Sequence, residues 1–146
     1  GATINTPSML CVEDYLDALA WAENVGGLDA LVHRADSNAA IISRFVEQAE
    51  WIDFLAGDVA TRSNTSVCLK IVDPEIAADA QASFAKGMVA LLDKAGIAFD
   101  IGAYRDAPAG LRIWTGATVE ASDLEALMPW LEWAYQQQRA TLAASA

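Results

Sequence analysis

The order of helical and strand-like patterns is the feature of this sequence that most restricts its fold. Apolar residues recur at helical spacing in four stretches, and four shorter runs are apolar or alternate as strands do. Along the chain these patterns predict the order α-α-β-β-α-β-β-α. This order leaves too few parallel β-α-β units for a doubly wound sheet. We therefore expect an α+β fold with a small, mostly antiparallel sheet and helices packed on one face.

Glycines, prolines and capping residues set the limits of these elements. The expected helices cover 8–25, 28–49, 73–95 and 122–138, and the expected strands cover 51–55, 65–72, 97–101 and 110–115. Asp73 and Pro74 are typical of a helix start, and Ser122 with Glu125 forms a capping-box pattern. In the second helix, we assign Asn38 to the polar face. Pro129 should bend the last helix, and residues 139–146 should fray.

The composition excludes several classes of function. The chain has 146 residues, a length typical of one domain, and its net charge is −11. An acidic surface repels nucleic acid and anionic lipids, and no apolar run reaches the roughly 20 residues of a membrane span. The two cysteines are not at metal-ligand spacing, and Cys68 should be a buried residue in a strand. We expect a cytoplasmic protein without nucleic-acid or membrane partners. Because the chain begins without methionine, we also expect it to be the C-terminal part of a longer one.

Two arginines around one turn are the main candidates for a binding site. Arg105 precedes the turn 107–110, and Arg112 lies in an otherwise apolar strand pattern. A guanidinium stays charged and offers paired donors that match a carboxylate or phosphate. The pair therefore suggests an anion clamp, although salt bridges to Asp100, Asp106 or Glu120 would explain it equally well. Trp114 should point to the same face as Arg112 and could line the same site.

Other polar residues give weaker signals. Asn5 and Thr6 precede Pro7 at a helix start, where side-chain donors can contact phosphate, although simple capping is the commoner use. Arg62 could extend a positive site. His33, the single histidine, has no nucleophile at a suitable spacing and is expected on a helix surface. No catalytic residue and no metal site is predicted in this chain.

Several segments together resemble the phosphoserine aminotransferase family, class V pyridoxal-phosphate enzymes of fold type I. The resemblance covers nearly the whole chain and runs to the family's C-terminal part. Its segments, in order, are 5–9, 12–16, 26–28, 62–67, 104–114 and 116–120. It implies that residues 1–50 link this part to a large domain that binds the cofactor, and that 51–146 form the small C-terminal domain.

The resemblance also implies a reaction and a role for each site residue. The family transfers an amino group between glutamate and 3-phosphohydroxypyruvate in serine biosynthesis, as a homodimer with pyridoxal 5'-phosphate. Arg112 matches the arginine that holds the substrate α-carboxylate, and Arg105 matches one near the distal anionic group. Asn5 and Thr6 match a pair that reaches the cofactor phosphate of the neighbouring subunit. The Schiff-base lysine would lie upstream, so this chain alone should be inactive.

Two features depart from the family pattern, and three alternatives stay open. Some members have His-Arg where this chain has Tyr104-Arg105, and the loop between the two arginines is longer here. Another class V aminotransferase, acting on alanine or glyoxylate, would have a similar sequence. A self-contained α+β module could capture a small carboxylate through Arg105 and Arg112. The chain could also be a purely structural dimerisation piece.

Overall fold

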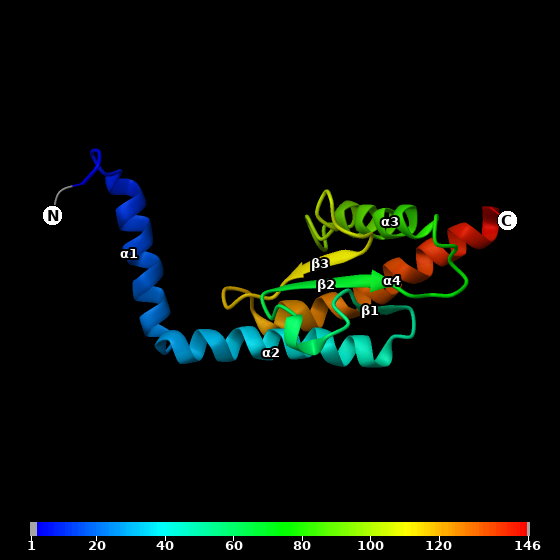
Figure 1. Ribbon diagram of the computed structural model, residues 1–146, viewed down its shortest axis with the longest axis horizontal. Helices are drawn as coiled ribbons and strands as arrows, with labels where there is room; N and C mark the ends of the chain where they lie inside the picture. The colour runs from blue at the N-terminus through cyan, green and yellow to red at the C-terminus, as the bar shows by residue number, and fades with distance from the viewer. Residues whose placement is uncertain (1–2, 146) are drawn as a thin grey trace.

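The computed structural model describes residues 3–145, and its elements follow the predicted α+β pattern (Figure 1). Two helices come first, and strands, a short 3-10 helix (η1) and two further helices follow along the described chain. Their bounds are α1 Met9–Asn24, α2 Gly27–Gln48, β1 Ile52–Phe54, η1 Val59–Thr61, β2 Ser66–Ile71, α3 Gln81–Lys94, β3 Leu111–Trp114 and α4 Ala121–Ser145. None of these helices is both long and apolar enough to cross a membrane.

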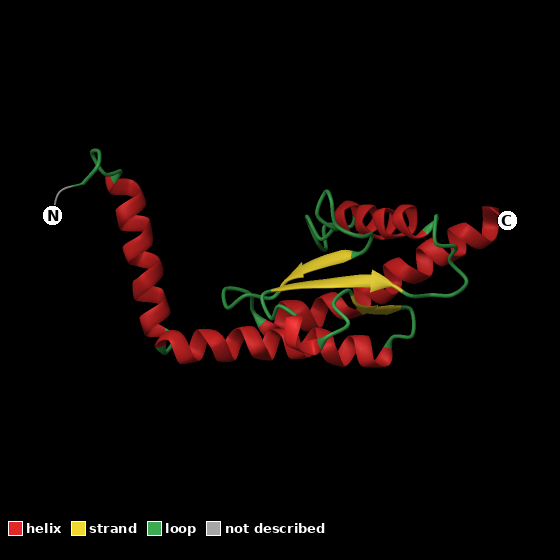
Figure 2. Ribbon diagram, in the orientation of Figure 1, coloured by secondary structure: helices red, strands yellow, loops and turns green. Residues whose placement is uncertain are grey.

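The sheet is antiparallel throughout, in the order β1-β2-β3. Alternate residues of β2 are buried, because Val67, Leu69 and Ile71 point to one face and their neighbours to the other. Helices cover that buried face: α3 and α2 both pack against α4 (Figure 2). The core between the layers includes Ile42, Met88, Leu92, Leu111 and Leu131. The prediction of helices on one face of a small antiparallel sheet is thus confirmed.

The predicted strand at 97–101 is wrong. This segment runs beside β3, but it forms only an isolated bridge between Gly102 and Leu111 and a hydrogen bond from the Arg112 N–H to the Ile101 carbonyl of 2.8 Å. Asp100 has a left-handed backbone with φ of 53°, which interrupts an extended strand. Ala98 and Ile101 still reach the core, whereas Phe99 is exposed, so the apolar pattern predicted burial in part and predicted the backbone pairing incorrectly.

The predicted start of the third helix and the frayed tail are also wrong. Asp73 begins a turn, in which its Oδ1 accepts from the Glu75 N–H at 2.8 Å, and α3 starts only at Gln81. Residues 139–145 continue α4, because Arg139 pairs with both Asp73 and Glu75 of that turn, and residue 146 lies outside the described residues. These ion pairs hold the tail against the β2–α3 connection. At its other end, α4 begins one residue before Ser122, so Ser122 does not cap it.

The first helix, α1, projects away from the rest of the molecule (Figure 1). No α1 residue is buried, and its apolar side chains, among them Leu10 and Tyr15, are exposed. Ser8 caps the helix, accepting from the Cys11 N–H at 3.5 Å. Among the described elements α1 packs chiefly on the start of α2, so its position depends on little else within this chain.

Candidate anion-binding site

Arg112 lies in β3 on the face of the sheet that the helices leave open. Its cross-strand partner is Cys68 of β2, and its side chain is about one-third exposed, at 32%. The guanidinium Nη2 lies 3.2 Å from Oδ2 of Asp100, whose side chain is 93% exposed. The Tyr104 ring centroid lies 6.0 Å from the guanidinium carbon. One of the predicted salt-bridge partners is therefore present, but it engages a single nitrogen from an exposed position.

Arg112 and Trp114 line one pocket of about 460 Å³, as the alternation of strand residues predicts. Ser66, Phe99 and Asp123 contribute other parts of the wall. The pocket therefore places one cation beside the aromatic rings of Phe99 and Trp114, and it also carries the carboxylates of Asp100 and Asp123. The cation and the rings suit a small organic anion, in which a carboxylate meets the guanidinium and the carbon atoms meet the rings.

Arg105 does not share the pocket of Arg112. It lies in the turn that follows Tyr104, is exposed, and lines a neighbouring cavity of about 680 Å³ together with Lys86 of α3. Within residues 3–145, Arg105 forms no ion pair. The two arginines thus line two different cavities.

Asn5 and Thr6 lie just before α1, at the end farthest from the sheet (Figure 1). Both are exposed, and the Thr6 N–H donates to Oδ1 of Asn5 at 2.8 Å. The hydroxyl of Thr6 hydrogen-bonds to none of the described residues. Sixteen helical residues separate this pair from α2, a length of about 24 Å. Within one chain, Asn5 and Thr6 therefore do not lie in the pocket of Arg112.

The remaining candidates have structural roles or none. Arg62 donates to the Ala56 carbonyl at 3.0 Å and stacks 3.9 Å above the Phe54 ring, so it is engaged by its own loop. His33 is exposed on α2, as predicted, within 3.5 Å of the Ser37 hydroxyl. Cys68 is half-exposed on the open face of the sheet, so the expectation of burial is wrong. Residues 3–145 contain no cluster of potential metal ligands.

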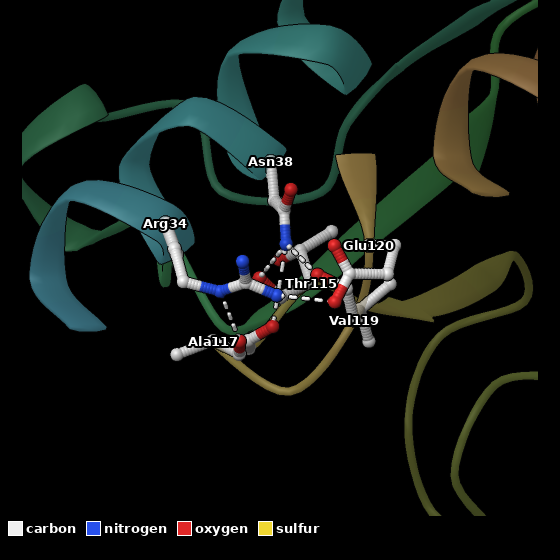
Figure 3. A network of polar contacts seen from close by, with 7 residues as sticks. Arg34, Asn38, Thr115, Ala117, Val119 and Glu120 are labelled. Carbon is white, nitrogen blue, oxygen red and sulfur yellow. Dashed lines mark hydrogen bonds and ion pairs between the residues drawn. The ribbon is translucent and has the colours of Figure 1, made fainter. Parts of the chain in front are cut away.

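A polar network that the sequence did not reveal fixes the loop after β3 (Figure 3). Asn38 is 2% exposed, so assigning it to the polar face of α2 is wrong. Its amide nitrogen faces the carbonyls of Thr115, Gly116 and Val119 at 3.3, 3.3 and 2.9 Å. One helical turn earlier, Arg34 donates to the Ala117 carbonyl at 2.7 Å and pairs with Glu120 at 2.6 Å. The only sequence signal was a polar residue one position from the apolar stripe of α2.

A second buried network joins α4 to the β2–α3 turn, away from the pocket of Arg112. Tyr135 donates to Oδ2 of Asp73 at 2.6 Å, and its ring stacks on Trp51 with centroids 4.3 Å apart. Burial, followed by the hydrogen bond to Asp73, raises the pKa of Tyr135 to about 12. Burial alone would raise the pKa of Asp73, but hydrogen bonds from Tyr135 and Glu75 and the charge of Arg139 lower it on balance. Every member is paired, so this network stabilises the fold rather than forming a site.

Curated relatives match the chain closely but are much longer. It is 50% identical over 135 residues to the phosphoserine aminotransferase of Methanosarcina mazei and 51% identical over 135 residues to that of Methanosarcina barkeri. Each match covers 92% of this chain and 35% of the relative. The chain thus spans about a third of the length of these relatives. No protein-family model matches the sequence.

Solved structures share the fold at lower identity. A phosphoserine aminotransferase from Bacillus circulans subsp. alkalophilus superimposes with a TM-score of 0.77 at 21% identity, over 92% of this chain and 34% of its own. A 4-hydroxyphenylacetaldehyde synthase from Rhodiola rosea gives 0.62 at 14% identity, over 75% and 22%. The curated relatives show that the chain is a homologue of the phosphoserine aminotransferases, and the solved phosphoserine aminotransferase shows that it has the fold of their C-terminal domain.

Proposed function

We propose that this chain is the C-terminal part of a phosphoserine aminotransferase that transfers an amino group between glutamate and 3-phosphohydroxypyruvate in serine biosynthesis, in the cytoplasm. The observation that carries the proposal is Arg112, whose guanidinium lies on strand β3 and lines a pocket. The chain that carries it is 50% identical to a phosphoserine aminotransferase. Residues 51–146 would form the small domain. Residues 1–50 would link it to the large domain, with Ile41 and Ile42 of α2 packed into the small domain's core.

Arg112 would bind the α-carboxylate of the substrate. Its backbone is held by pairing with β2, so the guanidinium has a stiff mount. The ion pair with Asp100 is single and exposed, and such pairs contribute little, at about 0–1 kcal/mol. A substrate carboxylate can therefore accept hydrogen bonds from two guanidinium nitrogens, while the Asp100 carboxylate is released into solvent. The bound carboxylate fixes one end of the substrate and orients its reacting carbon.

Asn5 and Thr6 would hold the phosphate of pyridoxal 5'-phosphate. An amide, a hydroxyl and the backbone N–H groups at the start of α1 are suitable donors for a phosphate, and both side chains are accessible. The residues therefore fit this part of the cofactor. When bound, the cofactor supplies the electron sink for amino transfer. Lys70, Lys86 and Lys94 lie on β2 and α3, so the lysine that binds the cofactor would belong to the remaining two-thirds of the enzyme.

A homodimer would explain why Asn5 and Thr6 lie far from Arg112 within one chain. Asn5 and Thr6 stand at the far end of α1, so they would complete the site of the neighbouring subunit rather than the site beside Arg112. The uncovered apolar side chains of α1 would be covered by the large domain or the partner. Arg105, exposed and without an ion pair among the described residues, would serve the distal anionic end of a substrate.

The proposal is tested by kinetics of the full-length enzyme carrying Arg112→Lys or Arg112→Ala. Loss of the paired donors should lower kcat/KM for phosphoserine on the order of 100-fold, mostly through KM. Arg44→Lys, on the exposed face of α2, is the matched control and should change nothing. An unchanged kcat/KM in both Arg112 variants would exclude this role.

A substrate panel on the same enzyme tests the reaction class. The fold alone does not fix the chemistry, because a 4-hydroxyphenylacetaldehyde synthase shares it. We expect a strong preference for phosphoserine over alanine as the amino donor to 2-oxoglutarate. Indifference to the phosphate would instead favour an aminotransferase of the alanine or glyoxylate type.

A further inference from the structure

We propose that Trp114 is a specificity-determining residue that forms a rigid wall of the Arg112 pocket and selects substrates with unbranched carbon chains. The proposal rests on the proposed role of Arg112 in binding the substrate carboxylate. It concerns the neighbouring side of the pocket, which meets the carbon atoms of the substrate rather than its charge.

Trp114 is placed to contact whatever Arg112 binds. It follows Arg112 by two positions in β3, so both side chains point to the open face, and both line the same pocket. Its cross-strand partner is Ser66, whose side chain is too small to cover an indole. The tryptophan consequently stays 57% exposed, with apolar surface turned toward the pocket and solvent.

The backbone of Gly116 supports the other side of the indole. A Cβ atom at Gly116 would lie 2.5 Å from Cζ2 and 2.8 Å from Cε2 of Trp114, far closer than atoms can approach. Only glycine leaves room for the ring in this position. The ring is therefore held against the loop that follows its own strand.

That loop is in turn held by α2 (Figure 3). The buried amide of Asn38 faces three of its carbonyls, and Arg34 donates to a fourth. Thr115, fully buried, donates through Oγ1 to the Asn64 carbonyl at 2.9 Å. Moving Gly116, and with it the support of the indole, would break several buried hydrogen bonds. The loop that backs the indole is thus fixed in position before a ligand arrives.

A rigid aromatic wall beside a guanidinium has two effects on a bound carboxylate. It excludes water from one side of the ion pair, which strengthens the electrostatic attraction. It also leaves little space for a branch on the carbon chain, since the loop behind the ring stops the ring from moving back. Rigid apolar walls of this kind discriminate on the order of 10-fold or more for each misplaced carbon.

The test measures kcat/KM of the full-length enzyme for 3-phosphohydroxypyruvate and for a branched 2-oxo acid, 2-oxoisovalerate. Trp114→Ala should lower the ratio of the two values on the order of 10-fold, and Trp114→Phe should retain most of it. Gly116→Ala should change the ratio as well, because the added methyl group displaces the ring from this position without altering Arg112. Trp130→Phe, which changes a tryptophan of α4 outside the pocket, is the control and should leave the ratio unchanged.

Two results separate this proposal from the proposed function. If Arg112→Lys impairs the enzyme while Trp114→Ala and Gly116→Ala keep the ratio, the wall is refuted and the carboxylate site stands. If the wild-type enzyme does not use 3-phosphohydroxypyruvate, the proposed function fails first. Circular dichroism of each variant confirms that the fold is intact, so an unchanged ratio counts against Trp114 itself.

Discussion

The two faces of the three-stranded sheet differ in both chemistry and burial. On the covered face, Val67, Leu69, Ile71, Leu111 and Ile113 are at most 3% exposed and belong to a continuous core. On the open face, every second residue of the same strands is polar, half-exposed or aromatic. That face carries Ser66, Cys68, Lys70, Arg112 and Trp114.

Within one strand, the residues of the covered face therefore stabilise the fold, and those of the open face are available for binding. Burial of the covered face supplies the hydrophobic free energy that holds the strands in register. The open face contributes little to that free energy, so its side chains are available for a ligand. Substitutions on the covered face should therefore lower the free energy of unfolding, and substitutions on the open face should change the enzyme kinetics.

The largest loss of stability should come from a substitution of Gly110, which lies directly before β3 and close to β2. Gly110 brings the start of β3 so close to β2 that a Cβ atom would lie 1.9 Å from the Leu69 carbonyl oxygen. Backbone cannot yield as a side chain can, so Gly110→Ala should cost more than about 4 kcal/mol, at the upper end of single substitutions. Urea unfolding of this variant measures the loss. Gly57→Ala, where a Cβ atom meets nothing within 4 Å, should stay close to wild type.

Neighbouring residues of β2 provide a smaller and sharper comparison. Leu69→Ala removes a side chain that is 1% exposed and should lower the free energy of unfolding by about 3 kcal/mol. Cys68→Ala, one position away on the open face, should change it by less than about 0.5 kcal/mol. Equal losses in the two variants would contradict the division between the faces.

The smallest predicted effect lies at the edge of the helical layer. Tyr135→Phe removes the hydrogen bond to the Asp73 carboxylate and should cost about 1.5 kcal/mol at pH 7. Because folding raises the pKa of Tyr135 from 10.0 to about 12, its contribution is complete below pH 10 and declines as the pH rises toward 12. Asp73 behaves in the opposite sense. Folding lowers its pKa, so its contribution is lost as the pH falls below the ordinary aspartate pKa of 3.8.

Unfolding by urea at several pH values checks the alkaline limb, which belongs to Tyr135. The difference between wild type and Tyr135→Phe should be constant from about pH 6 to 9 and shrink above pH 10. A difference that grows in alkali would show that the phenol does not act as a neutral donor in the folded protein.

Sequence patterns predicted the covered face better than the backbone around it. Periodicity indicated the alternation of β2 and β3 and the apolar stripe of α2, because burial of apolar surface determines those patterns. It failed at Asp100, where a left-handed residue interrupts strand geometry, although Ala98 and Ile101 on either side of it stay buried. It also failed at Asp73, whose carboxylate is held by Tyr135 and Arg139, residues some sixty positions away. Partners so far away along the chain cannot be recognised from the residues around Asp73.

The candidate site shows the same limit. The spacing of Arg112 and Trp114 correctly predicted one shared pocket, because residues two apart in a strand share a face. Arg105 was expected to join them, yet the turn carries it to the neighbouring cavity beside Lys86. The structural role of Asn38 was invisible, since its three carbonyl partners lie in a loop about eighty residues later.

The junction between α1 and α2 has a mechanical consequence. Only Val25 and Gly26 separate the two helices, and α1 extends from them as a rod about 24 Å long. A rotation of about 5° at this elbow would shift the start of the rod by about 2 Å. That displacement exceeds the tolerance of a hydrogen bond. Flexibility at this junction would therefore make the positions of Asn5 and Thr6 imprecise. Contacts made to α1 from outside this chain determine how precisely the two residues are placed.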